Sequence, residues 1–207
     1  MLSEEEQSAI ETVRSWIEGS GTTVALTGAG ISTDSGIPDF RGPKGLWTKD
    51  PAAEKMATLQ VYMADPEVRK RSWQWRLETE RNKREPNDGH RALVELERAG
   101  HLETLVTQNV DGLHQAAGSD PSRVVEIHGT LQEVLCLDCE ERAPMSRALA
   151  RVEAGEADPA CRSCGGMLKS ATISFGQGLV ARDLERAQRA AETCDLILAV
   201  GTTLAVY

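Results

Sequence analysis

The chain has 207 residues, 32 of them acidic and 23 basic, which gives a formal net charge of −9. This negative surplus argues against a nucleic-acid backbone as the main partner, and the absence of any run of about 18 apolar residues excludes a predicted membrane-spanning helix. The length suits one large domain, or one domain with a small insertion.

The first predicted elements are a helix and a short buried strand. The helix starts at a capping box, Ser3-x-x-Glu6, and ends near Gly19. Residues 22–27 (TTVALT) predict the strand, which runs directly into Gly28-Ala29-Gly30. Such a turn lets the backbone approach a phosphate closely. The third glycine of the usual dinucleotide fingerprint would fall at Thr33 and is missing, so a plain glycine turn stays an alternative.

Residues 34–55 are too irregular to predict a single element. Within them Asp39, Phe40 and Arg41 place a carboxylate, an aromatic ring and a guanidinium side by side. Arg41 can pair with a phosphate, and Phe40 can shield a reacting group from water.

Two helices, near 65–84 and 87–100, precede a predicted strand at 102–106. The loop after this strand holds Gln108, Asn109 and Asp111. Amides and a carboxylate at a strand end can hold ribose hydroxyls and order a water molecule. The alternative is a capping loop for a short helix near 112–117.

His128 follows the predicted strand 124–127 and precedes Gly129. By position it is the best general-base candidate among the four histidines. His90, His101 and His114 lie within or at the ends of helical patterns, so we interpret them as structural.

Four cysteines form two knuckles, Cys136-x-x-Cys139 and Cys161-x-x-Cys164. This spacing is typical of a closed, structural tetrahedral zinc site within a module at about 131–170. Two disulfides are the alternative. The N-terminus shows no secretory signal, so we expect a cytoplasmic setting in which thiols stay reduced. The fifth cysteine, Cys194, is predicted to be a buried small apolar residue.

The remaining predicted elements are a strand at 172–175, a helix at 182–193 and an apolar strand at 195–200, which ends in Gly201-Thr202-Thr203. Strands that alternate with helices predict an α/β fold with a doubly wound, mostly parallel sheet. Ligands bind such sheets beyond the carboxyl ends of the strands. Four strand ends carry unusual loops, at 28–41, 107–114, 128–129 and 201–203, and we expect these loops to converge.

These segments together resemble the sirtuins, the NAD-dependent protein deacylases, in their bacterial type. The resemblance rests on GAGISTDSGIPDFRG (28–42), TQNVDGLH (107–114), HG (128–129), the two cysteine knuckles and VGTTLAV (200–206), with further similarity in EPNDGHRAL (85–93).

The resemblance implies a protein-lysine deacetylase that transfers the acetyl group to ADP-ribose and releases nicotinamide. His128 and Asn109 would be catalytic, with His128 acting as general base on a ribose hydroxyl. The segment at Phe175 and Gly176 would pair with an acetyl-lysine peptide through backbone hydrogen bonds. NAD would be bound by Gly28, Ala29, Gly30, Ser32, Thr33, Asp39, Phe40, Arg41, Gln108, Asn109, Asp111, Gly201, Thr202 and Thr203. One structural Zn²⁺ would be bound by Cys136, Cys139, Cys161 and Cys164.

Three positions depart from the family pattern. Gln177 stands where a glutamate usually follows Phe-Gly, and Ser170 where a proline is usual. Desuccinylating sirtuins carry Tyr-x-x-Arg in the helical region before EPN, and this chain has Trp73-x-x-Arg76. We therefore expect deacetylation well above desuccinylation.

The resemblance also implies a division into domains. A Rossmann-like NAD-binding domain would comprise 1–130 and 171–207, the zinc module 131–170, and a helical part of the small domain about 43–85. The family continues beyond the last apolar strand, so we expect the sheet to lack its final strand or strands and NAD binding to be weak. Two alternative functions stay open: ADP-ribosyl transfer to a protein, which would use the same site residues, and an inactive zinc-ribbon or NAD-binding module. No oligomeric state is predicted.

Overall fold

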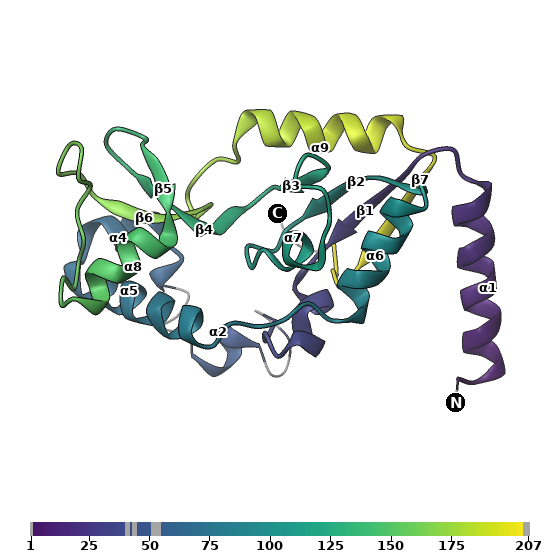
Figure 1. Cartoon of the computed structure of the whole chain (residues 1–207), viewed down its shortest axis with the longest axis horizontal. Coiled ribbons are helices and arrows are strands. Elements are labelled where there is room, and N and C mark those ends of the chain that lie inside the picture. The colour runs from purple at the N-terminus through teal and green to yellow at the C-terminus, as the bar shows by residue number, and fades with distance from the viewer. Residues whose placement is uncertain (1, 40–41, 43–44, 51–54, 205–207) are drawn as a thin grey trace.

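Two sheets organise the molecule, a parallel one in its larger part and an antiparallel one in its smaller part (Figure 1). This computed structural model describes residues 2–39, 42, 45–50 and 55–204. The parallel sheet has the strand order β3-β2-β1-β7. Its strands are β1 (Thr23–Thr27), β2 (Leu102–Thr107), β3 (Val124–Glu126) and β7 (Leu196–Val200).

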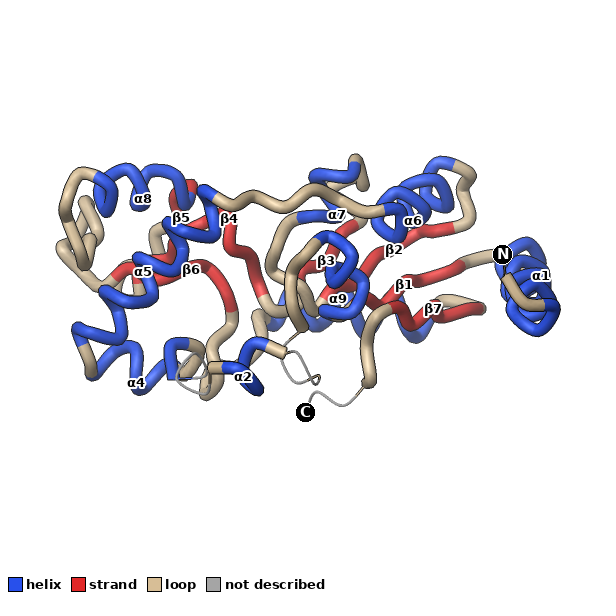
Figure 2. Tube along the Cα trace, turned by 90° about the horizontal axis from the view of Figure 1, so that it is seen from below, coloured by secondary structure: helices blue, strands red, loops and turns tan. Residues whose placement is uncertain are grey.

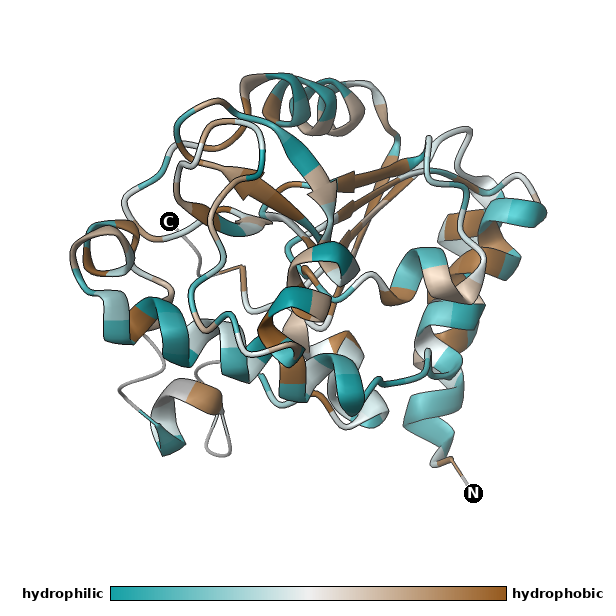
Figure 3. Ribbon diagram, turned by 60° about the vertical axis from the view of Figure 1, so that its left-hand side comes forward, coloured by the Kyte–Doolittle hydropathy of each residue, from teal (hydrophilic) through white to brown (hydrophobic). Residues whose placement is uncertain are grey.

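Helices cover both faces of the parallel sheet, as predicted for a doubly wound fold. Helix α6 (Asp88–Arg98) packs Leu93 on the face that carries Ala25, and α9 (Ala181–Thr193) packs Ala187 on the face that carries Val24. Successive residues of a strand point to opposite faces, so β1 is buried on both sides. This is why its sequence is apolar without alternation, and Figure 3 shows these apolar strands between the helices.

The edge strand β7 and the first helix are more exposed than the rest of this part. Ile197, the second residue of β7, is 47% exposed. Helix α1 (Glu4–Gly19) contains no buried residue and lies at the end of the molecule remote from the antiparallel sheet (Figures 1 and 2). Its predicted capping box is confirmed: Ser3 N–H donates to the Glu6 carboxylate at 2.7 Å, and Glu6 N–H donates to Ser3 Oγ at 3.2 Å.

The smaller part combines the antiparallel sheet, in the order β5-β4-β6, with several helices. Trp73 and Leu77 pack with Val134 of this sheet in one apolar cluster, and the Tyr62 hydroxyl donates to the Leu168 carbonyl at 2.7 Å. The elements are α2 (Leu46–Lys49), α4 (Leu59–Ala64), α5 (Pro66–Arg81), β4 (Gly129–Cys136), β5 (Arg142–Pro144), α8 (Met145–Glu153) and β6 (Leu168–Thr172).

The predicted strand at 172–175 is wrong, because the strand lies earlier, at Leu168–Thr172. After Thr172 the chain leaves the sheet and turns, since Gln177 N–H donates to the Ser174 carbonyl at 3.0 Å. Phe175 forms an isolated parallel β-bridge with Thr58.

Two smaller observations complete the fold. Cys194, which we predicted to be buried, is half-buried against the cluster beneath α9. Within the described ranges, none of the helices has the length and apolar character needed to cross a membrane.

Candidate active site

Four strand ends meet at one edge of the parallel sheet, as the sequence predicted. Thr27, the last residue of β1, is in register with Thr107 of β2 and with Val200 of β7, and Thr107 is in register with Glu126 of β3. Parallel strands that end at one level bring their following loops side by side, so the loops after β1, β2, β3 and β7 form a single site.

The glycine turn after β1 packs backbone on backbone against the loop after β7. A side chain on Gly30 would lie 2.8 Å from the Gly201 Cα, and one on Gly28 would lie 2.8 Å from the Gly201 carbonyl oxygen. Gly30 N–H donates to that same carbonyl at 2.8 Å. Gly201 itself has φ of 62°, and a Cβ on it would lie 2.1 Å from Ile31 N. The close contact between the two loops therefore requires glycine at positions 28, 30 and 201, whether or not a phosphate also approaches this backbone.

Asn109, Ser32 and Asp111 form one hydrogen-bonded group at the centre of the site. The Asn109 side-chain amide donates to the Gly28 carbonyl at 3.1 Å and to Ser32 Oγ at 3.2 Å. Ser32 Oγ donates to Asp111 Oδ2 at 2.7 Å. Asn109 and Ser32 are buried, so the group has fixed geometry, and the Asp111 carboxylate also accepts from Leu113 N–H at 3.0 Å. This arrangement can present polar atoms to a sugar.

His128 is half-buried and held by the loop after β2. Its Nδ1 lies 3.0 Å from the Gln108 carbonyl oxygen. Because a carbonyl only accepts hydrogen bonds, Nδ1 is the donor, and in the neutral tautomer of the ring this leaves the lone pair on Nε2. A neutral imidazole with its lone pair on Nε2 can act as a general base. The Gln108 side-chain oxygen accepts from Thr202 Oγ1 at 3.4 Å, which joins the β2 and β7 loops.

Two buried histidines support this site from behind. His90 Nε2 lies 3.5 Å from Ser32 Oγ, and His114 Nε2 lies 2.9 Å from Thr27 Oγ1. Their rings are 4.9 Å apart. Burial lowers the pKa of His114 to about 4, with the neighbouring His90 acting in the same direction and Asp111 opposing it. The structural interpretation of both residues agrees with these contacts, but the sequence did not indicate that they touch the site.

Three further predicted NAD-binding residues, Thr33, Asp39 and Thr203, belong to the described parts of the loops after β1 and β7. Thr33 and Thr203 are exposed, and Thr33 Oγ1 donates to the Gly30 carbonyl at 2.8 Å. Asp39 Oδ1 accepts from Gly42 N–H at 3.0 Å. The predictions for Phe40 and Arg41 lie outside the described residues.

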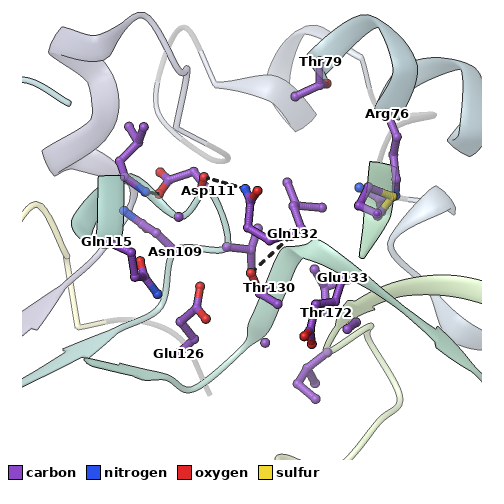
Figure 4. A pocket seen from close by; sticks show the side chains of 18 of the residues that line it. Arg76, Thr79, Asn109, Asp111, Gln115, Glu126, Thr130, Gln132, Glu133 and Thr172 are labelled. Carbon is purple, nitrogen blue, oxygen red and sulfur yellow. Dashed lines mark hydrogen bonds between the residues drawn. The ribbon is translucent and has the colours of Figure 1, made fainter. Parts of the chain in front are cut away.

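A cleft of about 1360 Å³ separates the two parts of the molecule and reaches the site. Asn109 and Asp111 line it from the parallel sheet, and Arg76 of α5 lines it from the smaller part (Figure 4). Glu126 also faces the cleft, and its burial raises the pKa of its carboxyl, against the opposing effect of bonds with Thr130 and Gln115. Sequence reasoning missed Glu126, although its place two residues before His128 was a signal.

In the predicted substrate segment, the backbone of Phe175 is already hydrogen-bonded to the chain on either side of Thr58. Phe175 N–H donates to the Ala57 carbonyl at 2.8 Å, and the Phe175 carbonyl accepts from Leu59 N–H at 3.0 Å. Phe175 as a whole residue is 42% exposed. Gly176 is also exposed, and its backbone groups have no partner among the residues that the structure describes. Within the described part of the chain, the Gly176 backbone is thus the part of this segment that is open to pairing with another strand.

The four predicted zinc ligands converge on one point. The sulfurs of Cys136, Cys139, Cys161 and Cys164 all lie within 4.8 Å of one another. A tetrahedral zinc with Zn–S bonds of 2.3 Å needs sulfur separations of about 3.8 Å, and two of the observed separations are 3.5 and 3.8 Å. The residue after each knuckle, Glu140 or Gly165, has positive φ. The donor set therefore fits a structural Zn²⁺.

Comparisons with known proteins agree with these features. The family model described as "Sir2 family" matches residues 28–207. NAD-dependent protein deacetylase 2 of Streptomyces coelicolor is 52% identical over 181 residues, which cover 87% of this chain and 75% of that protein.

Solved structures give the same result. One from work on the mechanism and regulation of Sir2 enzymes superposes with a TM-score of 0.84 at 39% identity, covering 97% of this chain and 78% of that one. A Sir2 variant solved with a deacetylated p53 peptide and 3′-O-acetyl-ADP-ribose superposes with a TM-score of 0.84 at 32% identity, covering 96% and 78%.

Proposed function

The chain belongs to the Sir2 family, and on this premise we propose that it is an NAD-dependent protein-lysine deacetylase. It transfers the acetyl group of acetyl-lysine in a protein or peptide to ADP-ribose and releases nicotinamide. The observation that carries the proposal is the meeting of Asn109, Asp111 and His128 at one edge of the sheet, beside the glycine contact of two loops.

NAD, when bound, supplies the ribose that receives the acetyl group and the nicotinamide that leaves. In our proposal the Gly28–Gly30 turn and the loop at Gly201–Thr203 accommodate the dinucleotide, and the buried group of Ser32, Asn109 and Asp111 holds the nicotinamide ribose. His128 Nε2 accepts a proton from a ribose hydroxyl, because its Nδ1 proton is held by Gln108. Gly176 pairs with the substrate backbone.

We also propose how the chain is divided. Residues 1–130 and 171–207 form the NAD-binding domain, except for a helical segment at about 43–85. That segment belongs to the small domain together with the zinc module, residues 131–170. The contacts of Trp73 and Tyr62 with the antiparallel sheet support this grouping. A site with four thiolate ligands requires reduced cysteines, so we propose a cytoplasmic location.

The test is a deacetylation assay with an acetyl-lysine peptide, with and without NAD, and mass spectrometry of the products. We expect O-acetyl-ADP-ribose from the unaltered protein and a loss of about 10²- to 10⁴-fold in rate for His128→Ala, the usual contribution of a general base. His101→Ala is the control, and circular dichroism checks that each variant folds. Unchanged turnover in His128→Ala would remove the catalytic assignment, and ADP-ribosylated protein as the product would replace deacetylation.

A further inference from the structure

Lys169 is a buried lysine outside the site described above. It lies on β6 and is 2% exposed. Its ammonium donates to three neutral oxygens: the Ser170 carbonyl at 3.0 Å, the Thr172 carbonyl at 2.5 Å and the Gln177 side-chain oxygen at 3.2 Å. No carboxylate of the described residues pairs with it, and burial, with nearby Arg76, lowers the pKa of its amine to about 8.

Burying an ammonium with neutral partners is unfavourable for the free energy of folding. A buried ammonium loses its hydration, and neutral acceptors compensate less than a carboxylate would. A methionine of similar length would occupy the same space without that cost. The contacts of Lys169 therefore indicate that its charged ammonium holds these three acceptors in place.

Two of the three acceptors, on Thr172 and Gln177, lie at the two ends of one loop, and the third, the Ser170 carbonyl, lies within β6. Gln177 accepts from Lys169 and also from Ser174 N–H at 2.9 Å, through the same side-chain oxygen. Lys169 thus connects the strand before the loop to the residue that closes it. The loop between them carries Phe175 and Gly176, the segment proposed to meet the substrate peptide.

On the basis of the proposed function, we propose that Lys169 is a positioning residue for the acyl-peptide: it holds Gln177 and so preorganises the loop 172–177 that presents Phe175 and Gly176. A peptide that adds to a strand edge through backbone bonds binds more weakly when the edge must first be ordered. Loss of the ammonium should consequently weaken the peptide and leave NAD and the chemical step largely unaffected.

The experiment uses Lys169→Met, Lys169→Arg and Gln177→Leu in the full chain. We expect Lys169→Met to raise the KM for an acetyl-lysine peptide on the order of tenfold, with the KM for NAD within about twofold and kcat within about threefold. Lys169→Arg should restore most of the peptide affinity because it keeps the charge and the donors. Gln177→Leu should resemble Lys169→Met, and the double variant should be little worse than either single variant.

Direct binding of a fluorescent acetyl-lysine peptide, measured by anisotropy, separates this proposal from the proposed function. If the unaltered protein binds the peptide but shows no NAD-dependent turnover, the function fails and the role of Lys169 can still be measured. Zinc content and thermal melting check that the variants fold. An unchanged peptide affinity in folded Lys169→Met, equal losses for peptide and NAD, or additive effects in the double variant would overturn the proposal. If Lys169→Met does not fold, Gln177→Leu and Lys169→Arg decide it by the same affinities.

Discussion

At the scale of single residues, His114 behind the site is buried and incompletely hydrogen-bonded. His114 is 1% exposed, and its Nδ1 has no partner among the described residues. A neutral imidazole can tolerate this environment, whereas a charged one would be buried beside His90. The same pair contacts Ser32 and Thr27, so protonation there should disturb the site itself.

Acid should therefore destabilise the protein through His114. Its pKa is about 4 in the folded chain against an ordinary value of 6.5, so below pH 6.5 the unfolded chain binds a proton that the folded chain excludes. Stability from this residue is present above pH 6.5 and is lost as the pH falls toward 4, by up to about 3 kcal/mol. Urea unfolding at several pH values should show a steeper loss for the unaltered protein than for His114→Gln. Equal slopes for the unaltered protein and His114→Gln would refute the assignment.

At the scale of elements, the cysteine knuckles connect the antiparallel sheet to the loop that follows α8. Cys136 ends β4, and Cys161 N–H donates to the Gly166 carbonyl at 2.7 Å just before β6. Both strands lead toward the cleft, because β4 starts at Gly129, next to His128, and β6 ends at Thr172. A metal at the far end thus holds two strands that reach the site, without a role in the chemistry.

Removal of zinc should unfold this smaller part and abolish deacetylation together. The reason is that binding of a structural zinc contributes directly to the free energy of folding. Titration with a chelator, followed by zinc release, circular dichroism and activity, should give three curves that coincide. Cys164→Ser should lower the zinc content below one per chain, and Cys194→Ser, whose sulfur lies outside the cluster, should not. Full activity after complete zinc removal would exclude the structural role.

At the scale of the whole molecule, the cleft is lined by side chains from both the larger part, with the parallel sheet, and the smaller part, with the antiparallel sheet. Arg76 lines it, and one of its terminal nitrogens is buried without a partner among the described residues. Burial lowers the pKa of this guanidinium to about 10, against the smaller opposing effect of Tyr62, and it stays charged at neutral pH. Trp73, three residues earlier, has no hydroxyl, and it is 1% exposed in the core of the smaller part.

We therefore expect acetyl-lysine to be preferred over succinyl-lysine by at least about tenfold in kcat/KM, since one missing hydrogen bond to a charged group is worth about that factor. Arg76→Met should lower the remaining desuccinylation further and change deacetylation by no more than about threefold. Arg71→Met on the exposed side of the same helix, where Arg71 pairs with Asp50 at 2.9 Å, is the control. Comparable rates on the two acyl peptides would contradict this prediction.

The sequence alone determined most elements and the position of the site. Local spacing specifies caps, periodic faces and cysteine knuckles, and parallel strands of similar length bring their ends to one edge whatever the details of packing. The predicted convergence of the loops at Gly28, Asn109, His128 and Gly201 is confirmed for this reason. The strand prediction at 172–175 failed because local apolar character cannot reveal that Gln177 turns the chain back.

Only the tertiary structure decided which residues touch across the chain. Gly30 meets Gly201, Phe175 meets Leu59, and the buried His114 lies behind the site. These contacts join residues far apart in sequence, and their free energies depend on burial and on which polar groups remain unpaired, neither of which local spacing records. The position of the chemistry could therefore be predicted from the sequence, while its supports, including the bond of Lys169 to Gln177, required the folded chain.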